Sequence, residues 1–170
     1  NPSNRSTKRA RNSALRTRNF SRSRDMKKGV DFTGVSIVYF CHDGAGNVLL
    51  QKRSTNCRDE HGTWDPGAGG LELHDTVEET LRKEIAEEYG TDVLDYEFLG
   101  YRDVHREHEG AKTHWIALDF KVLVDREKAR NGEPHKFEAV EWFTKDALPQ
   151  PQHSQFPFFL EKYNERLWQA

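Results

Sequence analysis

Residues 69–91 read Gly-Gly-Leu-Glu-Leu-His-Asp-Thr-Val-Glu-Glu-Thr-Leu-Arg-Lys-Glu-Ile-Ala-Glu-Glu-Tyr-Gly-Thr, a glycine-rich turn that runs into a charged helix. Residues at positions i, i+3 and i+4 share one face of a helix, so Glu84, Glu87 and Glu88 are predicted to lie side by side. Three neighbouring carboxylates repel each other unless a cation neutralises them. Because Mg²⁺ and Mn²⁺ prefer oxygen ligands, this stretch predicts a site for a hard divalent cation.

The same helix carries an apolar stripe beside these carboxylates, as expected at about 100° per residue. The stripe consists of Val77, Leu81, Ile85 and Tyr89. The carboxylates therefore lie at the boundary of the core, where a sheet or loop can close over them. Gly90 suits the left-handed conformation that ends many helices. The flanking glycines argue against the alternative, a solvated acidic helix with ordinary ion pairs.

The spacing of these residues resembles the Nudix box, G-x5-E-x7-R-E-U-x-E-E-x-G-U, where U is apolar. The matching positions are Gly69, Glu84, Ile85, Glu87, Glu88 and Gly90. Asp75 and Lys83 keep the charges of the usual Glu and Arg, whereas Thr91 stands where an apolar residue is usual. Lysine keeps the positive charge but loses the two-pronged geometry of arginine. The chain thus resembles the MutT-like Nudix hydrolases over residues 32–168.

The resemblance implies the identity of the metal site and of the catalytic residues. The implied ligands of Mg²⁺ or Mn²⁺ are Glu84, Glu87, Glu88 and the carbonyl of Ala68, which precedes the box glycine. Catalytic roles fall to Glu87, Glu88 and Lys83. The bound cation would neutralise a diphosphate and lower the pKa of a bound water, which attacks phosphorus.

Further candidates lie outside the helix. The general base is left open among Glu87, Glu88 and an outside carboxylate such as Glu138. Arg53, at the end of a predicted strand, is a candidate for binding substrate phosphate, with an ordinary surface role equally weighted. Trp64 is a candidate for stacking on a base, and packing in the core is an equal alternative.

Two acidic residues near the start of the helix receive structural roles. Asp75 is predicted to cap the helix N-terminus and to pair with Lys83. Glu72 is interpreted as an exposed residue of an extended segment.

The order of predicted elements indicates an α+β fold. The predicted strands are 33–40, 48–53, 93–101, 113–124 and 140–143, and the predicted helices are 75–89 and 156–168. A polar connection containing His105, Arg106 and His108 is expected between the third and fourth strands. This order is similar to that of the Nudix fold, an α/β/α sandwich in which a mixed, partly closed sheet lies between helices.

Length and charge limit the classes of function. A chain of 170 residues can form one domain with a real core. It has no run of about 18 apolar residues, which excludes a membrane-spanning helix. Of its 26 basic and 28 acidic residues, residues 1–25 hold eight and one, so residues 26–170 carry a formal net charge of −9. An acidic domain argues against a stable nucleic-acid partner.

Residues 1–25 are rich in Arg, Ser and Asn and are predicted to be disordered, leaving residues 26–170 as the folded domain. The segment is interpreted as a nucleic-acid or membrane-surface arm, as an organelle presequence, or as an extraneous piece. We favour the last, because Met26 is the only methionine and Met26-Lys27-Lys28-Gly29 precedes the first strand.

Cysteine and histidine usage offers little further chemistry. Cys41 and Cys57 form no metal-binding spacing and fit a reducing, cytoplasmic location. The histidines, among them His105 and His114, lack a closed zinc ligand set with cysteine.

The leading functional prediction is a Mg²⁺-dependent pyrophosphohydrolase acting on a nucleoside diphosphate derivative or a (deoxy)nucleoside triphosphate. One alternative is a non-catalytic nucleotide-sensing module. Another is an enzyme like isopentenyl diphosphate isomerase, which would need a catalytic cysteine that Cys41 does not match. The resemblance also leaves a homodimer open.

Overall fold

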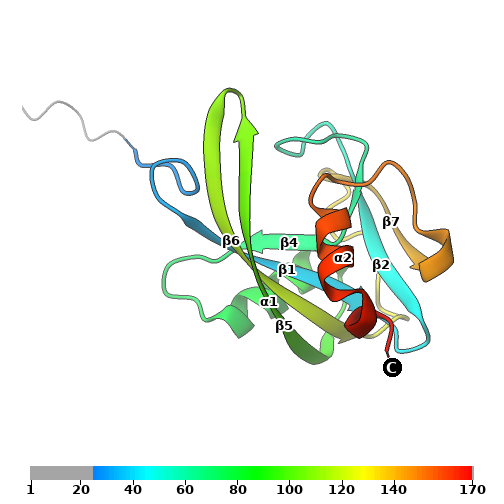
Figure 1. Cartoon of the computed structure of the whole chain (residues 1–170). Helices are drawn as coiled ribbons and strands as arrows, with labels where there is room; N and C mark the ends of the chain where they lie inside the picture. Colours follow the sequence, from blue (N-terminus) through cyan, green and yellow to red (C-terminus); the bar gives the residue numbers. More distant parts are fainter. Residues whose placement is uncertain (1–24, 170) are drawn as a thin grey trace, which may run out of the picture.

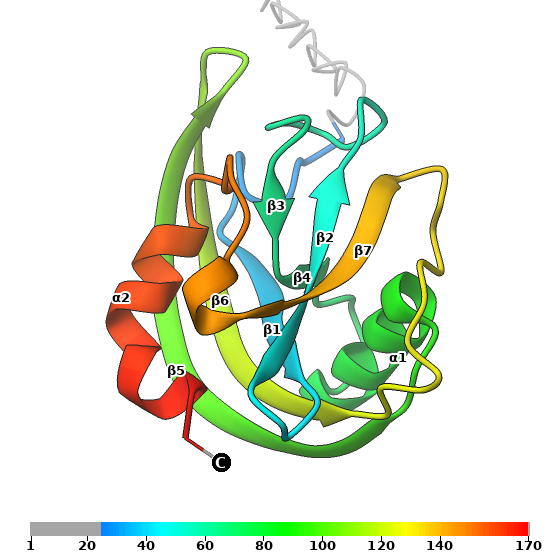
Figure 2. The same cartoon turned by 90° about the vertical axis from the view of Figure 1, so that its right-hand side faces the viewer.

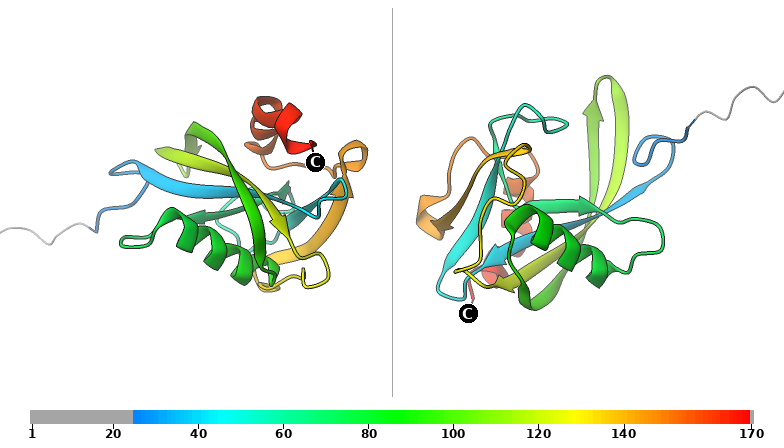
Figure 3. Two further views of the ribbon diagram at one scale, coloured as in Figure 1. Left: turned by 90° about the horizontal axis from the view of Figure 1, so that it is seen from below. Right: turned by 180° about the vertical axis from the view of Figure 1, so that it is seen from behind.

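A mixed sheet lies between two helices in the computed structural model, which describes residues 25–169 (Figures 1 and 3). The strands are β1 (Gly34–His42), β2 (Asn47–Arg53), β3 (Trp64–Asp65), β4 (Gly67–Gly70), β5 (Val93–His108), β6 (Ala111–Val124) and β7 (Phe137–Thr144). The helices are α1 (Val77–Tyr89), the short 3-10 helix η1 (Lys145–Ala147) and α2 (Phe156–Leu167). The predicted α/β/α arrangement is confirmed.

The seven strands form one open sheet in the order β3-β2-β1-β6-β5, with β4 also paired to β1 and β7 to β2. β1 and β6 run parallel, whereas the other pairs are antiparallel. Figure 2 shows the β5–β6 hairpin curving around one side of the sheet and extending beyond it. β1 therefore lies at the centre, with partners on both edges.

Burial of β1 on both faces explains its nearly unbroken apolar sequence. Successive side chains of a strand point to opposite faces. Ile37, Tyr39 and Cys41 join the core under α1, whereas Phe40 joins the core under α2. The two helices thus cover opposite faces of the same sheet (Figure 3).

Thr76, not the predicted Asp75, caps the start of α1. The Thr76 hydroxyl accepts from the backbone N–H of Glu79, and the Glu79 carboxylate accepts from the backbone N–H of Thr76. This reciprocal capping box satisfies two N–H groups that the helix leaves without partners. At the other end, Gly90 adopts the predicted left-handed conformation with φ of 58°.

Replacing the capping residue gives a first testable result. We expect Thr76→Ala to lower the free energy of unfolding by about 1 kcal/mol, the usual cost of losing such a cap. Urea denaturation measures this change. A Thr76→Ser variant retains the hydroxyl and is expected to recover most of the loss, so equal losses in both variants would contradict the capping role.

The β5–β6 hairpin is longer than predicted, because the expected polar connection is itself strand. β5 runs on to His108 and β6 begins at Ala111. The alternation in this part of β5 places Arg102, Val104 and Arg106 on one face. Polar residues occupy both faces, so the hydrophobic pattern that marks a strand is missing here.

The predicted disordered segment, residues 1–25, lies outside the described residues except for Asp25. No helix within residues 25–169 is long and apolar enough to cross a membrane.

Candidate active site

The three glutamates of α1 that belong to the box differ in how deeply they are buried. Glu87 is exposed, Glu84 is half-buried and Glu88 is buried. Glu84 lies directly against Gly69 of β4, where an added methyl group would overlap the Glu84 carboxyl. Glycine is therefore needed at position 69, because the Glu84 carboxyl occupies the space that a side chain of residue 69 would fill.

Glu88 is held on both oxygens by neighbouring strands and loops. Its Oε2 accepts from the Tyr39 hydroxyl and, at 3.2 Å, from Gln51 Nε2, while Oε1 accepts from Lys136 Nζ at 2.7 Å. Burial raises the pKa of the Glu88 carboxyl, and the Lys136 charge counteracts this shift. Glu88 thus ties α1 to β1, to β2 and to the loop before β7.

Lys136 is a site residue that the sequence did not reveal. Its ammonium bridges Glu88 Oε1 at 2.7 Å and Glu133 Oε2 at 3.0 Å. Burial opposes the charge on Lys136, but the two carboxylates more than compensate and raise its pKa. No local pattern links Lys136 to Glu88, because the pairing depends on how the loop before β7 folds back onto α1.

The oxygen groups at this place fit a hard divalent cation. Burial raises the pKa of Glu84 to about 7, and the charge of Glu88 adds to the shift. A nearby cation would remove this penalty on ionised carboxylates. Glu84, Glu87 and Glu88, with the exposed Ala68 beside Gly69, are the residues that could hold it. The donor set contains oxygen only, as Mg²⁺ and Mn²⁺ prefer.

A cavity of about 460 Å³ begins at this glutamate cluster, where Ala68, Gly69 and Lys136 line it. Its lining also includes apolar side chains of the sheet and of α2, namely Val38, Val104, Trp115, Phe156 and Phe159. Arg53, Arg58, Arg102 and Arg106 contribute positive charges along the wall. The cavity thus combines charged and apolar side chains, as a phosphorylated organic ligand requires.

Arg53 lines the cavity, and the carboxylates of Asp59 and Asp65 hold its guanidinium. Arg53 Nη2 donates to Asp59 Oδ1 at 3.0 Å, and Nη1 lies 3.7 Å from Asp65 Oδ2. Burial raises the pKa of Asp65 to about 7. Arg106 pairs with Asp59 and Glu60 on the same wall. This network positions the wall and is absent from the sequence-based prediction.

Trp64, the candidate for stacking on a base, and Glu138, a candidate general base and substrate-binding residue, are not among the residues that line the cavity. Trp64 is buried and packs edge-on against Phe143, with ring centroids 5.0 Å apart. Glu138 pairs with Lys52 at 2.8 Å on the neighbouring strand. Trp64 thus lies in the core, which is one of the two alternatives weighed from the sequence, and the role of Glu138 stays a prediction.

Lys83 also differs from its predicted pairing. Within the described residues its ammonium lies 3.8 Å from Glu72 Oε2, and both side chains are substantially exposed. It therefore pairs neither with Asp75 nor with Glu87. An exposed pair at this distance contributes little to stability.

Cys41 is fully buried in the core under α1, and burial raises the pKa of its thiol well above the usual value. Such a thiol does not ionise readily, which disfavours the isomerase alternative.

His153, beside the cavity, is neutral by geometry. Its Nδ1 accepts from the Gln155 backbone N–H at 3.2 Å, and its Nε2 lies 3.3 Å from Glu60 Oε1. Both ring nitrogens are therefore satisfied in the neutral tautomer. Burial lowers the pKa of His153 to about 4, with the charges of Arg53 and Arg106 adding to the shift and that of Glu60 opposing it.

This lowered pKa predicts a pH effect on stability. An unfolded histidine titrates near pH 6.5. As pH falls from about 6.5 toward 4, the unfolded state binds a proton that the folded state does not, so stability falls. We expect His153→Gln to reduce this loss by roughly 1–3 kcal/mol in urea denaturation. The control is His74→Asn, at an exposed position, which should retain the wild-type loss; an unchanged loss in His153→Gln would contradict the assignment.

The fold and the site define a class: proteins in which a glycine loop and an acidic helix, packed on a mixed sheet, form a carboxylate site at the mouth of a cavity. The family profile of the NUDIX domain matches residues 32–163. The chain belongs to the Nudix family, and it is a hydrolase that acts on pyrophosphate bonds.

Solved structures agree with this assignment. A MutT NUDIX hydrolase from Burkholderia pseudomallei is 28% identical, with a TM-score of 0.68 over 77% of this chain and 98% of that chain. A MutT protein from Bacillus halodurans is 22% identical, with a TM-score of 0.59 over 75% and 80%. A NUDIX hydrolase from Nitrosomonas europaea is 16% identical, with a TM-score of 0.62 over 79% and 90%. The last two support the fold alone.

Proposed function

We propose that this hydrolase uses Mg²⁺ or Mn²⁺ to cleave the diphosphate linkage of a nucleoside diphosphate derivative or a (deoxy)nucleoside triphosphate. The observation that carries the proposal is the junction of the glutamate cluster with the cavity at Ala68, Gly69 and Lys136. A diphosphate at this junction would meet the carboxylate-held cation and the Lys136 ammonium. The rest of the substrate would lie against the apolar side chains that line the cavity.

The proposal assigns a separate role to the residues of the site. Glu84, Glu87, Glu88 and the Ala68 carbonyl would hold the cation, which would neutralise the diphosphate and activate a water. Lys136 supplies a further positive charge to the phosphate. Water attacks one phosphorus, the bridging P–O bond breaks, and the proton of the water passes to a carboxylate.

The proton acceptor is a carboxylate of α1 in this account. Glu88 has both oxygens in hydrogen bonds, and Glu138 pairs with Lys52. These contacts favour Glu84 or Glu87 as the acceptor, since neither carboxyl is engaged in a comparable set of bonds among the described residues.

The substrate is identified by a panel of (deoxy)nucleoside triphosphates, ADP-ribose, dinucleoside polyphosphates and nucleotide sugars, assayed for product release with Mg²⁺, with Mn²⁺ and with chelator. We expect turnover of one class, abolished by chelator and strongly reduced in Glu87→Gln. Tight nucleotide binding without turnover of any class would instead favour a sensing module. The cytoplasmic location and the homodimer stay predictions.

A further inference from the structure

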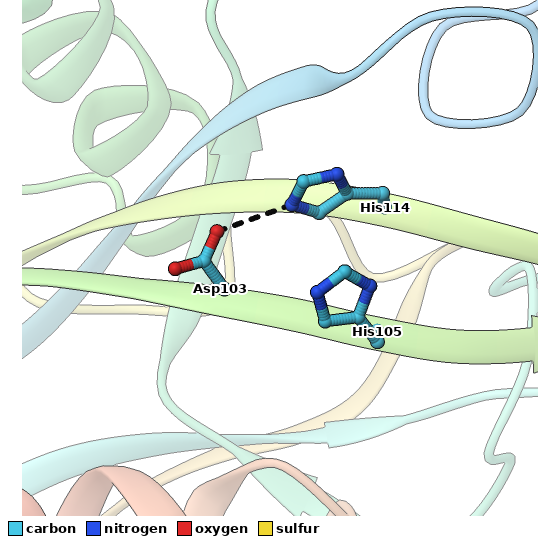
Figure 4. A group of neighbouring side chains, drawn as sticks. All are labelled: Asp103, His105 and His114. Atoms are coloured by element: carbon cyan, nitrogen blue, oxygen red, sulfur yellow. Dashed lines mark hydrogen bonds and ion pairs between the residues drawn. The ribbon is translucent and has the colours of Figure 1, made fainter.

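Three metal-ligating side chains converge on the β5–β6 hairpin, away from the glutamate cluster. His105 of β5 is directly opposite His114 of β6 in the register of the two strands. Asp103, two residues before His105, shares its face of the strand. One ligand atom from each side chain lies within 4.8 Å of the others, and Figure 4 shows the three groups facing one another.

We propose that Asp103, His105 and His114 form a second metal site that binds Zn²⁺. Two imidazoles and one carboxylate make a nitrogen-rich set, which suits zinc rather than Mg²⁺. A water molecule would complete a four-coordinate shell, because these ligands approach from one side and the site is open to solvent. The site thus differs from the all-oxygen cluster of α1 both in place and in ion.

Closure around an ion requires the two imidazole rings to turn out of their stacked arrangement. The two imidazole rings stack nearly parallel, with centroids 4.2 Å apart and planes 20° apart, and Asp103 Oδ1 lies 3.1 Å from His114 Nε2. Zn–N bonds of about 2.0–2.1 Å require ligand atoms roughly 3.3 Å apart around a tetrahedral ion. Asp103 and His105 are exposed, so side-chain rotation can supply the remaining shift.

Thr33 provides the outer contact that a metal-binding histidine usually has. Its hydroxyl lies 3.3 Å from His114 Nδ1. A hydroxyl can donate or accept, so Thr33 can accept from Nδ1–H once Nε2 gives up its proton to bind the ion. The ring proton moves from Nε2 to Nδ1 in this step, so the neutral imidazole keeps one proton, and the Asp103 carboxylate remains beside Nε2 as a ligand.

The backbone around the site is already fixed. The His114 N–H donates to the Gly29 carbonyl at 2.8 Å, which attaches β6 to the segment before β1. On the opposite face of the same strands, Val104, Arg106 and Trp115 line the cavity. An ion held by Asp103, His105 and His114 would therefore clamp the strands that form this cavity wall.

In the sequence, the histidines have no cysteine at a zinc-binding spacing. Asp103 and His105 are separated from His114 by the hairpin turn, so their meeting depends on strand register. The pairing of β5 with β6 therefore brings together three ligands that no spacing in the sequence links.

The test is a calorimetric titration of the full-length protein with Zn²⁺ in excess Mg²⁺, which occupies the carboxylate site. We expect one equivalent of Zn²⁺ to bind to the wild type and to His74→Asn, and none to the double variant His105→Asn/His114→Asn. Asn tolerates the left-handed conformation of His74, whose φ is 80°. Thr33→Val should weaken binding by roughly 10-fold.

Imidazole NMR signals give a second, residue-specific result. The signals of His105 and His114 should shift with the added equivalent of Zn²⁺, whereas those of His74 should not. Binding of the same equivalent by the double variant, or unshifted His105 and His114 signals in the wild type, would overturn the proposal. Because the histidine variants leave the α1 glutamates intact, hydrolytic failure and zinc-site failure are separable.

Discussion

Gly69→Ala is expected to lower kcat by roughly 100-fold or more while leaving the fold intact. The added methyl group would overlap the Cδ and Cγ atoms of Glu84, so the carboxyl must move out of place. Displacements of about 1 Å within a catalytic group can cost about 100-fold in rate. Steady-state kinetics on the substrate identified by the panel, with circular dichroism to monitor folding, measures this effect.

The chain offers a matched control at the next residue. A methyl group added at Gly70 would meet nothing within 4 Å, although Gly70 belongs to the same strand and lines the same cavity. Gly70→Ala should therefore change kcat far less than Gly69→Ala. Equal losses in the two variants would indicate a backbone effect and would contradict the role assigned to the Glu84 contact.

Asp119→Ala is expected to lower the free energy of unfolding by about 3–5 kcal/mol, because it would leave the largely buried guanidinium of Arg102 without its carboxylate partner. Asp119 is fully buried and accepts from Arg102 Nε at 2.8 Å, from Arg102 Nη2 at 2.9 Å and from the Tyr163 hydroxyl at 2.9 Å. These bonds join β5, β6 and α2 behind the cavity wall. Urea denaturation of the wild type and the variant gives the difference.

An exposed ion pair provides the comparison for this loss. Asp92 Oδ2 lies 2.7 Å from Lys128 Nζ, and both side chains are more than half exposed. Solvent screens such exposed pairs, so Asp92→Ala should have a small effect. If Asp119→Ala proved no more damaging than Asp92→Ala, the buried network would not stabilise the fold as described.

The sequence predicted the parts of the fold that local pattern specifies. α1 was predicted within two residues at its start, because its apolar period and its terminal glycine are both local. The capping residue was wrong by one position, since Asp75 and Thr76 are both residues that cap helices well. The extension of β5 was missed because polar side chains occupy both of its faces.

The parts of the site that the sequence did not predict depend on contacts between residues that are far apart in the sequence. The Lys136 ammonium pairs with Glu88, which is 48 positions away in the sequence. The carboxylate of Asp59, a loop residue, pairs with Arg106. Trp64 was a reasonable candidate for stacking by residue type, but only its packing against Phe143 reveals its place in the core. Residue type and spacing thus identified the glutamates, whereas the cavity wall required the folded arrangement.

The central claim is that hydrolysis depends on the carboxylates that α1 presents at Gly69. The most direct test compares kcat for Glu84→Gln with kcat for Glu78→Gln, using the identified substrate and saturating Mg²⁺. Glu78 lies on the same helix and forms an exposed pair with Arg82. The account predicts that Glu84→Gln loses roughly 10²–10⁴-fold in kcat, whereas Glu78→Gln stays near the wild type. Wild-type turnover in Glu84→Gln would contradict it.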